Sequence, residues 1–351
     1  MKHGIGIVGY GDMAEWHCTQ QYDVLKQFEV RGIWDIRRER RELAEKNGYR
    51  VYENLQELLD DGAVELVLIA TPNDVHKEIS IRAMEAGKAV VCEKPVTLCT
   101  ADLDEIINVA ERTGQFFTVH QNRRWDQDFL TMKKVIEEDV LGRIYRIESR
   151  VHGSRGIPND WRCQKEFGGG MVLDWGVHLL DQALLFYPEA RVKTVYATLT
   201  HVTNEDVDDG FTVDLGMDNG VHIYVEVGTS NYVSLPRWYV LGNNGTAVID
   251  EWKKLKGRIV YANGSHEESI EPIITATGRT KTMAPRREDC FVTRELPEVA
   301  VERNGFYQNV LGVLERREES LIQLSQVRRV MCLMEAVFES AEKQRVIRFE
   351  D

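Results

Sequence analysis

A chain of 351 residues is long for one hydrophobic core and long enough for two domains. Its formal net charge of −13 argues against nucleic acid or an anionic membrane as a partner, and no apolar run reaches the length of a membrane span. The six cysteines show no C-x-x-C spacing, so we expect free thiols in a cytoplasmic protein and no zinc site among them.

The chain opens on a short apolar run, residues 5–8, followed by a glycine-rich turn with the pattern G-x-G-x-x-A. The run predicts a strand buried on both faces of a parallel sheet, and the composition of residues 15–28 predicts a helix after it. In such a unit Gly9 allows the tight turn, Gly11 lets backbone N–H groups approach a pyrophosphate, and Ala14 lets the helix pack closely on the strand. We therefore expect a dinucleotide to contact Gly9, Tyr10, Gly11, Asp12, Met13 and Ala14.

A second predicted strand, residues 29–34, ends at Asp35, about 20 residues after the glycine turn. A carboxylate at this position accepts hydrogen bonds from the adenosine ribose and repels a 2′-phosphate, so NAD is favoured over NADP. The neighbouring Ile36 is expected to lie against the cofactor as well. Arg37 and Arg38 weaken the preference for NAD, unless they are simply solvated helix residues.

Two further predicted strands, residues 64–70 and 88–92, each end in a turn with polar side chains. Ligands of parallel sheets bind beyond the carboxyl ends of the strands, so these turns are expected to meet the cofactor. Lys94 precedes a proline and cannot continue a helix or a ladder, which directs its ammonium into the crevice. A simpler interpretation of the first turn is that Pro72 and Asn73 only start the next helix. The expected cofactor contacts here are Thr71, Pro72, Asn73, His76, Glu93 and Lys94.

Three glycines, residues 168–170, precede a helical segment in which Asp174, His178 and Asp181 recur at intervals of four and three. Residues so spaced share one helix face, and two carboxylates with an imidazole are costly to bury without partners or a purpose. The spacing fits a catalytic face, and it equally fits a core histidine satisfied by Asp174 with Asp181 as a structural acceptor. A metal site has less support because no further ligand is evident, so we predict none.

The second half of the chain changes to a strict alternation of apolar and polar residues, for example over 211–215 and 221–227. This alternation predicts strands with one face on a core. Further strands are expected over 143–152 and 191–202, with a hairpin over 237–250, and helices over 126–138, 296–318 and 325–343. The outward sheet face, expected to carry Tyr224, Tyr232 and Tyr239, predicts a homodimer or homotetramer through this sheet.

The glycine turn with Asp35, the Thr-Pro-Asn-x-x-His turn at 71–76 and the Glu-Lys-Pro turn at 93–95 together resemble the Gfo/Idh/MocA oxidoreductase family. Residues 168–181 are similar to the family motif G-G-G-x-L-x-D-x-G-x-H-x-x-D. The resemblance covers essentially the whole chain. It implies an α/β fold class, with an N-terminal Rossmann doubly wound parallel sheet over residues 1–121. A C-terminal α+β domain with a large open, mostly antiparallel sheet is implied over 122–351, its last helix free to pack back on the first domain.

The resemblance also implies a catalytic set of Lys94, Asp174 and His178. We expect His178, oriented by Asp174, to take the hydroxyl proton while Lys94 hydrogen-bonds the developing alkoxide. The reverse assignment of His178 and Lys94 fits the sequence equally. Besides Asp174 and His178, the expected substrate contacts are Asn122, Arg124, Trp161 and Arg162.

These features predict an oxidoreductase that transfers hydride between NAD and a secondary alcohol of a small-molecule sugar, cyclic polyol or glycoside. One alternative is an enzyme of the same fold, a lyase or glycosidase that oxidises a sugar transiently and recycles its NAD. Another is a regulatory protein that senses NAD without turnover. Intact catalytic residues argue against a regulatory protein, and the sequence does not identify the sugar or polyol.

Overall fold

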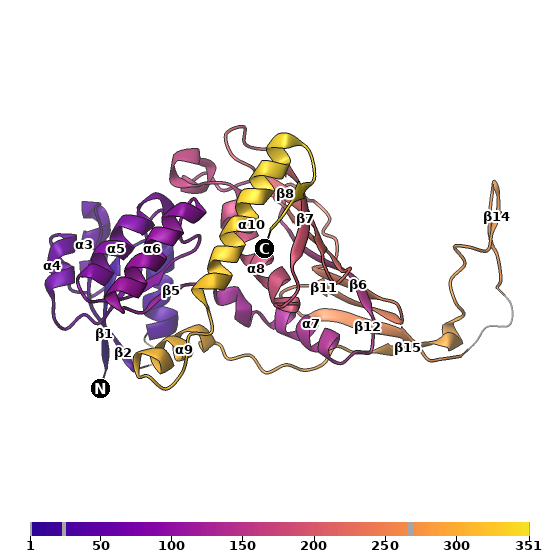
Figure 1. Ribbon diagram of the computed structural model, residues 1–351, viewed down its shortest axis with the longest axis horizontal. Helices are drawn as coiled ribbons and strands as arrows, with labels where there is room; N and C mark the ends of the chain where they lie inside the picture. The colour runs from indigo at the N-terminus through magenta and orange to yellow at the C-terminus, as the bar shows by residue number, and fades with distance from the viewer. Residues whose placement is uncertain (1, 23–25, 266–269, 351) are drawn as a thin grey trace.

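The computed structural model describes residues 2–22, 26–265 and 270–350, and two β-sheets lie side by side in it (Figure 1). The first sheet is parallel, with the strand order β2-β1-β3-β4-β5. Its strands are β1 (His3–Val8), β2 (Phe28–Trp34), β3 (Leu66–Ile69), β4 (Ala89–Cys92) and β5 (Phe117–Val119). Because the strand order reverses direction between β1 and β3, the crevice that favours a ligand lies beyond the carboxyl ends of these two strands. The predicted Rossmann-type sheet is confirmed.

Several helices connect the strands of this sheet. They are α1 (Asp12–Trp16), the π-helix η1 (His17–Tyr22), α3 (Arg38–Lys46), α4 (Leu55–Asp60), the 3-10 turn η2 (Asn73–Val75), α5 (His76–Glu85) and α6 (Thr100–Thr113). The helix predicted over 15–28 extends too far, because Phe28 already belongs to β2. Val51 forms an isolated bridge to Ile33 at the edge of the sheet.

The second sheet has nine strands in the order β15-β12-β11-β10-β6-β9-β8-β7-β16. The pair β6·β9 is parallel and the other pairs are antiparallel, which confirms a mostly antiparallel sheet. Alternation is confirmed along β8, where Phe211, Val213 and Leu215 are buried and the residues between them are half-buried. The strands are β6 (Ile144–His152), β7 (Val192–Thr200), β8 (Gly210–Met217), β9 (His222–Gly228), β10 (Trp238–Gly242), β11 (Gly245–Glu251), β12 (Lys256–Ala262), β15 (Phe291–Arg294) and β16 (Ile347–Arg348).

The α-helices described after β5 are α7 (Gln127–Glu137), α8 (Val177–Phe186), α9 (Gly305–Leu314) and α10 (Leu324–Lys343), of which α9 lies beside β2 of the first sheet. The helix predicted over 296–318 is wrong in its first half, because α9 begins only at Gly305. Pro297 disfavours a helical residue before it. A Cβ on Gly305 would overlap the ring of Trp125, so the glycine lets α9 lie directly on that side chain.

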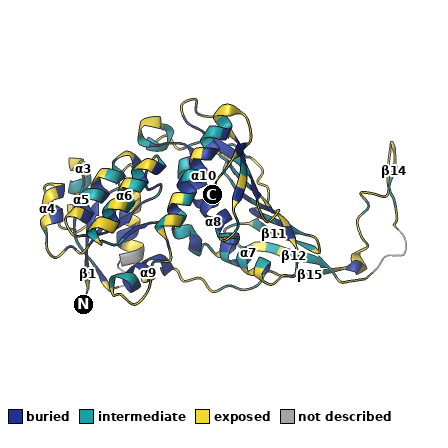
Figure 2. Ribbon diagram, viewed as in Figure 1, coloured by how far each residue is buried: buried dark blue, intermediate teal, exposed yellow. Residues whose placement is uncertain are grey.

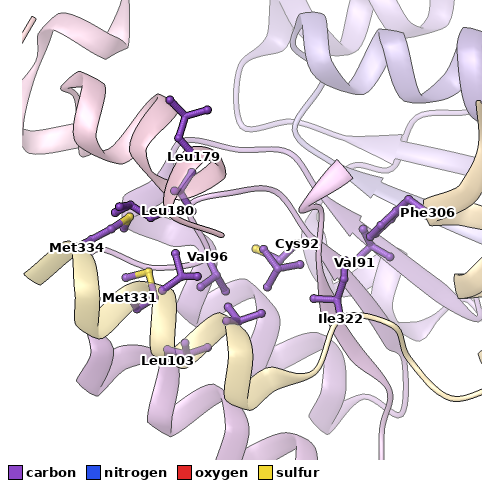
Figure 3. Close-up of a cluster of buried hydrophobic side chains, with 14 of the residues drawn as sticks. Val91, Cys92, Val96, Leu103, Leu179, Leu180, Phe306, Ile322, Met331 and Met334 are labelled. Carbon is purple, nitrogen blue, oxygen red and sulfur yellow. The ribbon is translucent and has the colours of Figure 1, made fainter. Parts of the chain in front are cut away.

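A continuous apolar core joins the two sheets. In Figure 3, Met331 and Met334 of α10 lie among Leu179 and Leu180 of α8 and Leu103 of α6, and all five side chains are fully buried. The buried faces of α8 and α10 are visible between the sheets in Figure 2.

Polar contacts also hold α10 on the first part of the chain. Arg328 Nε donates to Asp104 at 2.6 Å, and Glu335 accepts from the backbone N–H of Thr100 at 2.7 Å. The helix α10 therefore packs against α6 of the first part of the chain and against β7 of the second sheet.

A buried ion pair lies at the turn where the chain leaves the first sheet. Arg124, in the 3-10 turn η3 (Asn122–Trp125), donates to both carboxylate oxygens of Asp181 at 2.7 and 2.6 Å. Its other N–H groups donate to Leu321 O, Gln326 and Gln121, so all five guanidinium donors have protein partners. Arg124 therefore has no N–H group left over for a substrate, and Asp181 accepts two of its hydrogen bonds.

Within the described ranges, no helix is long and apolar enough to cross a membrane. Cys92, Cys99, Cys163 and Cys332 are free thiols, as expected from their spacing.

The ion pair gives a first prediction. Arg124→Met leaves the Asp181 carboxylate buried without its partner, so we expect the free energy of unfolding to fall by about 3–5 kcal/mol in urea denaturation. Adding Asp181→Asn removes the unpaired charge, and the double variant should recover part of that loss. Wild-type stability in Arg124→Met would show that the pair does not join the two parts of the chain.

Candidate functional site

The glycine turn after β1 has the geometry that its sequence predicts. Gly9 has a φ of +88°, and a Cβ there would lie 2.6 Å from the carbonyl oxygen of Ala70. A Cβ on Gly11 would have no heavy atom within 4 Å, so this side of the turn faces open space. Asp12 and Met13 lie in the exposed first turn of α1, and Ala14 is fully buried beneath it. The turn can therefore receive a phosphate group at the N-terminus of α1 without rearrangement.

The Tyr10 side chain lies in the hydrophobic core. Its ring is buried, and its hydroxyl accepts a hydrogen bond from Asn47 at 3.0 Å. The cofactor can therefore meet Tyr10 only through its backbone, and the backbone N–H already donates to Asp35 at 2.7 Å.

Asp35 lies against the glycine turn at the end of β2. One carboxylate oxygen accepts from Tyr10 N and the other accepts from Arg37 N at 2.8 Å. The neighbouring Ile36 is 81% exposed. Arg38 is largely exposed and donates to Glu42 at 2.8 Å, as a solvated helix residue does.

The turn after β3 is tied to the turn after β4 through His76. The ring is fully buried, with Nδ1 3.0 Å from Pro95 O and Nε2 3.0 Å from Thr71 O. Burial lowers the pKa of His76, although its backbone partners oppose this. Both ring nitrogens therefore face backbone carbonyls rather than the open side of the glycine turn.

Two neighbours of His76 in this turn remain candidates for binding. The hydroxyl oxygen of Thr71 is buried and has no hydrogen-bond partner among the described residues, so it could serve a bound cofactor. Asn73 donates to Gly168 O at 3.1 Å and so links this turn to the glycine run at 168–170. Pro72 lies between them at the start of η2.

Lys94 and Asp174 meet from opposite parts of the chain. The Lys94 ammonium lies 2.8 Å from Asp174 Oδ1 and 2.9 Å from the Asp174 carbonyl oxygen. Arg162 Nε lies 3.2 Å from the other carboxylate oxygen, and its guanidinium lies over the ring of Trp161 at 4.6 Å. Burial alone would raise the pKa of Asp174, but the charges of Lys94 and Arg162 lower it overall. Asp174 is therefore an ionised carboxylate between two cations.

His178 lies close to this group but is not oriented by Asp174. Asp174 is in the π-helical turn η6 (Val172–Gly176) and His178 is in the first turn of α8, and the Asp174 carboxylate pairs with Lys94 and Arg162 instead. His178 is buried, and its Nδ1 has no hydrogen-bond partner among the described residues. Burial and the charges of Lys94 and Arg123 hold its pKa well below the ordinary value. The imidazole is therefore neutral.

The structure adds two residues that the sequence pattern did not identify. Asp208 is buried. Its backbone carbonyl accepts from Met171 N at 3.0 Å and its carboxylate accepts from Val172 N at 2.8 Å, so it fixes the start of the segment that carries Asp174. Burial raises the pKa of Asp208 to about 6. Arg123 lies over Trp175 at 4.3 Å, which places a second cation near His178. Both contacts join residues distant in sequence, and no local motif indicates them.

Asn122 is half-buried at the start of η3, and Glu93 is buried beside Lys94. The structure therefore brings together, at the carboxyl ends of β1, β2, β3 and β4, the glycine turn, Asp35, Thr71, Asn73, Glu93 and Lys94. Arg162, Asp174 and His178 join them from the second part of the chain.

Comparison with known proteins gives concordant matches. Residues 3–121 match the oxidoreductase family with an NAD-binding Rossmann fold, and residues 129–248 match the GFO/IDH/MocA C-terminal domain. The crystal structure of an NAD-binding protein from Listeria innocua is 47% identical, covers 99% of both chains and has a TM-score of 0.95.

Two curated relatives are more distant. An uncharacterized oxidoreductase of Schizosaccharomyces pombe is 31% identical over 312 residues, which are 85% of this chain and 84% of that protein. The scyllo-inositol 2-dehydrogenase (NADP(+)) of Bacillus subtilis is 32% identical over 205 residues, 58% of this chain and 57% of that enzyme. The chain therefore belongs to the Gfo/Idh/MocA family of oxidoreductases, with an NAD-binding Rossmann domain at its N-terminus.

Proposed function

We propose that the protein is a dehydrogenase that moves hydride between NAD and a CH–OH carbon of a cyclic polyol, sugar or glycoside. The observation that carries this proposal is the Lys94 ammonium, held 2.8 Å from the Asp174 carboxylate beside a buried, neutral His178. A cation that can bind a developing alkoxide and a base that can take its proton are the two groups that alcohol oxidation requires.

The turn residues Gly9 to Ala14, Asp35 and Thr71 would hold NAD, which supplies the hydride acceptor. The open space beside Gly11 and the unpartnered Thr71 hydroxyl support this assignment. Asp35 disfavours a 2′-phosphate, so NAD should bind more tightly than NADP, although the Bacillus subtilis relative is named for NADP. We place the cofactor domain at residues 1–121 and the substrate domain at 122–351, a division that the extents of the two family matches support.

The contacts favour His178 as the proton acceptor. An ammonium that is paired with a carboxylate has no lone pair to offer, whereas a neutral imidazole does. Lys94 then donates a hydrogen bond to the substrate oxygen as negative charge develops there, and Asp174 keeps the ammonium in place. Because its lowered pKa makes His178 a weak base, the rate should depend strongly on the charge of Lys94.

The direct test is to incubate the protein with NAD or NADP and a panel of inositols, aldoses, sugar acids and glycosides while following nicotinamide absorbance. Reduction with one group of substrates, faster with NAD, would support the proposal. An aglycone released without net reduction, detected by mass spectrometry, would indicate an enzyme that recycles its cofactor. Tight NAD binding with no product from any substrate would indicate a sensing protein.

Substitution of the two reacting groups gives a second prediction. Lys94→Met should lower kcat by about 10²–10³-fold because the alkoxide loses its cation, and His178→Gln should lower it by about 10²–10⁴-fold. Lys77→Met is the matched control, because Lys77 on α5 pairs with Asp102 and Glu105 on α6. Wild-type kcat in both site variants would contradict the mechanism.

The glycine turn gives a third prediction. Gly11→Ala should leave the free energy of unfolding within about 1 kcal/mol of wild type, because the new Cβ meets open space, yet weaken NAD binding at least tenfold in calorimetry. Gly9→Ala should instead destabilise the fold, because its backbone is left-handed and its Cβ meets Ala70 O. Equal NAD affinity in Gly11→Ala and wild type would place the pyrophosphate elsewhere.

We also propose that the protein assembles as a homodimer or homotetramer through its second sheet. Residues 270–287, here called the arm, include the hairpin of β13 (Ile273–Thr275) and β14 (Gly278–Thr280), which stands away from the sheet (Figure 1). The arm exposes Ile274 and Met283 and carries Arg279, Lys281 and Arg286, in a chain whose net charge is −13. Apolar and basic groups of this kind complement an acidic second copy.

Of the three tyrosines expected on the outward face, Tyr232 is 89% exposed and Tyr224 and Tyr239 are half-buried. For a homo-oligomer, light scattering at micromolar concentration should give the mass of a dimer or tetramer. Replacing residues 271–286 of the arm with a short Gly-Ser linker should reduce that mass. A monomeric wild type would contradict this fourth prediction.

A further inference from the structure

A buried polar cluster lies behind the Glu-Lys-Pro turn, and the mechanism above does not use it. Its side chains are those of His17 of η1, Glu93 after β4, His120 after β5 and Tyr307 of α9, and all four residues are buried. Aromatic rings surround them; for example, Phe306 lies edge-on to His120 at 4.7 Å. Four segments far apart in the sequence therefore meet at one carboxylate.

The contacts form a continuous chain. The Tyr307 hydroxyl lies 2.8 Å from His17 Nδ1, and His17 Nε2 lies 2.7 Å from Glu93 Oε1. His120 Nδ1 lies 2.9 Å from the same oxygen. The other carboxylate oxygen of Glu93 accepts from the backbone N–H of Lys94 at 3.2 Å.

The protonation states fix the direction of these hydrogen bonds. Burial lowers the pKa of His17 to about 4, and the neighbouring His120 contributes, so His17 is neutral. Burial alone would raise the pKa of Glu93, but His120 and His17 hold it well below the ordinary value. A neutral imidazole has one N–H, which here donates from Nε2 to Glu93, so Nδ1 accepts from Tyr307.

We propose that Tyr307, His17 and His120 are positioning residues that fix the Glu93 carboxylate and, through it, Lys94. This inference rests on the proposed role of Lys94. The lysine is held at both ends: its backbone by Glu93 and its ammonium by Asp174. Because Tyr307 belongs to α9, the docking of α9 on the first sheet completes the orientation of Lys94.

A divalent metal is the competing occupant of this cluster. The ligand atoms of His17, Glu93 and His120 lie within 4.8 Å of one another. However, the two ring nitrogens approach the same carboxylate oxygen at 2.7 and 2.9 Å, which are hydrogen-bond distances. With Tyr307 as donor to His17, the hydrogen bonds need no metal ion, and the purified protein should contain no stoichiometric zinc or other transition metal.

The first test needs no substrate. In a ¹⁵N-histidine NMR spectrum of the whole protein, His17, assigned by His17→Gln, should be the neutral Nε2–H tautomer. Tyr307→Phe should shift its Nδ1 resonance, because that nitrogen loses its donor. Tyr52→Phe is the matched control, since Tyr52 is buried and its hydroxyl donates instead to Asp61 at 2.8 Å. An unchanged His17 signal in Tyr307→Phe, or one bound metal ion per chain, would overturn the proposal.

The second test, and the fifth prediction, measures turnover on the substrate that the panel identifies. Tyr307→Phe should lower kcat about tenfold while the Kd for NADH and the KM stay within twofold, and Tyr52→Phe should change none of them. His120→Asn retains an amide donor near Nδ1 and should keep most of the activity that His120→Leu loses. Equal loss in these two His120 variants would indicate a packing role only. If no substrate reacts, the proposed function fails, whereas the NMR and metal results still decide whether the hydrogen-bond chain exists.

Discussion

The contact between Lys94 and Asp174 is the interaction on which the candidate site depends. Lys94 comes from the turn after β4 and Asp174 from the helical turn η6 in the second part of the chain, and each charge would be costly to bury alone. The pair therefore forms only when the two parts of the chain are docked. The Arg124–Asp181 pair and the apolar contacts of α10 maintain that docking. The Glu93 carboxylate accepts a hydrogen bond from the backbone N–H of Lys94 and so holds its backbone. The contacts that dock the two parts of the chain thus determine both the stability of the fold and the geometry of the site.

Features set by local sequence could be predicted. The glycine turn needs a left-handed residue at Gly9 and space at Gly11, and both requirements are visible in the pattern G-x-G-x-x-A. The strand ends that carry Asp35 and Lys94 follow from apolar runs, because buried parallel strands are continuous in hydrophobicity. The alternation in β8 likewise predicts which residues face the core. These predictions hold because each depends on neighbours in sequence.

Features set by distant contacts could not be predicted. Arg124 looks like a free cation in the sequence, and only the fold brings Asp181, Gln326 and Leu321 to its guanidinium. His76 faces two carbonyls because the turns after β3 and β4 are adjacent in space. The spacing of Asp174 and His178 suggested a hydrogen-bonded pair, but Asp174 pairs with Lys94 and Arg162 instead. In each case the side chain has the expected chemistry, but its partner is distant in sequence and no local pattern indicates it.

The interaction of Lys94 with Asp174 is tested most directly by a double-mutant cycle on Lys94→Met and Asp174→Asn, with the free energy of unfolding of the intact chain as readout. A buried pair that joins the two parts of the site should show a coupling energy of at least about 1 kcal/mol, so that the double variant loses less than the sum of the single losses. Additive losses would mean that Lys94 and Asp174 do not interact in solution. The site would then not be assembled by this contact, and the assignment of Lys94 as the cation at the substrate oxygen would lose its structural basis.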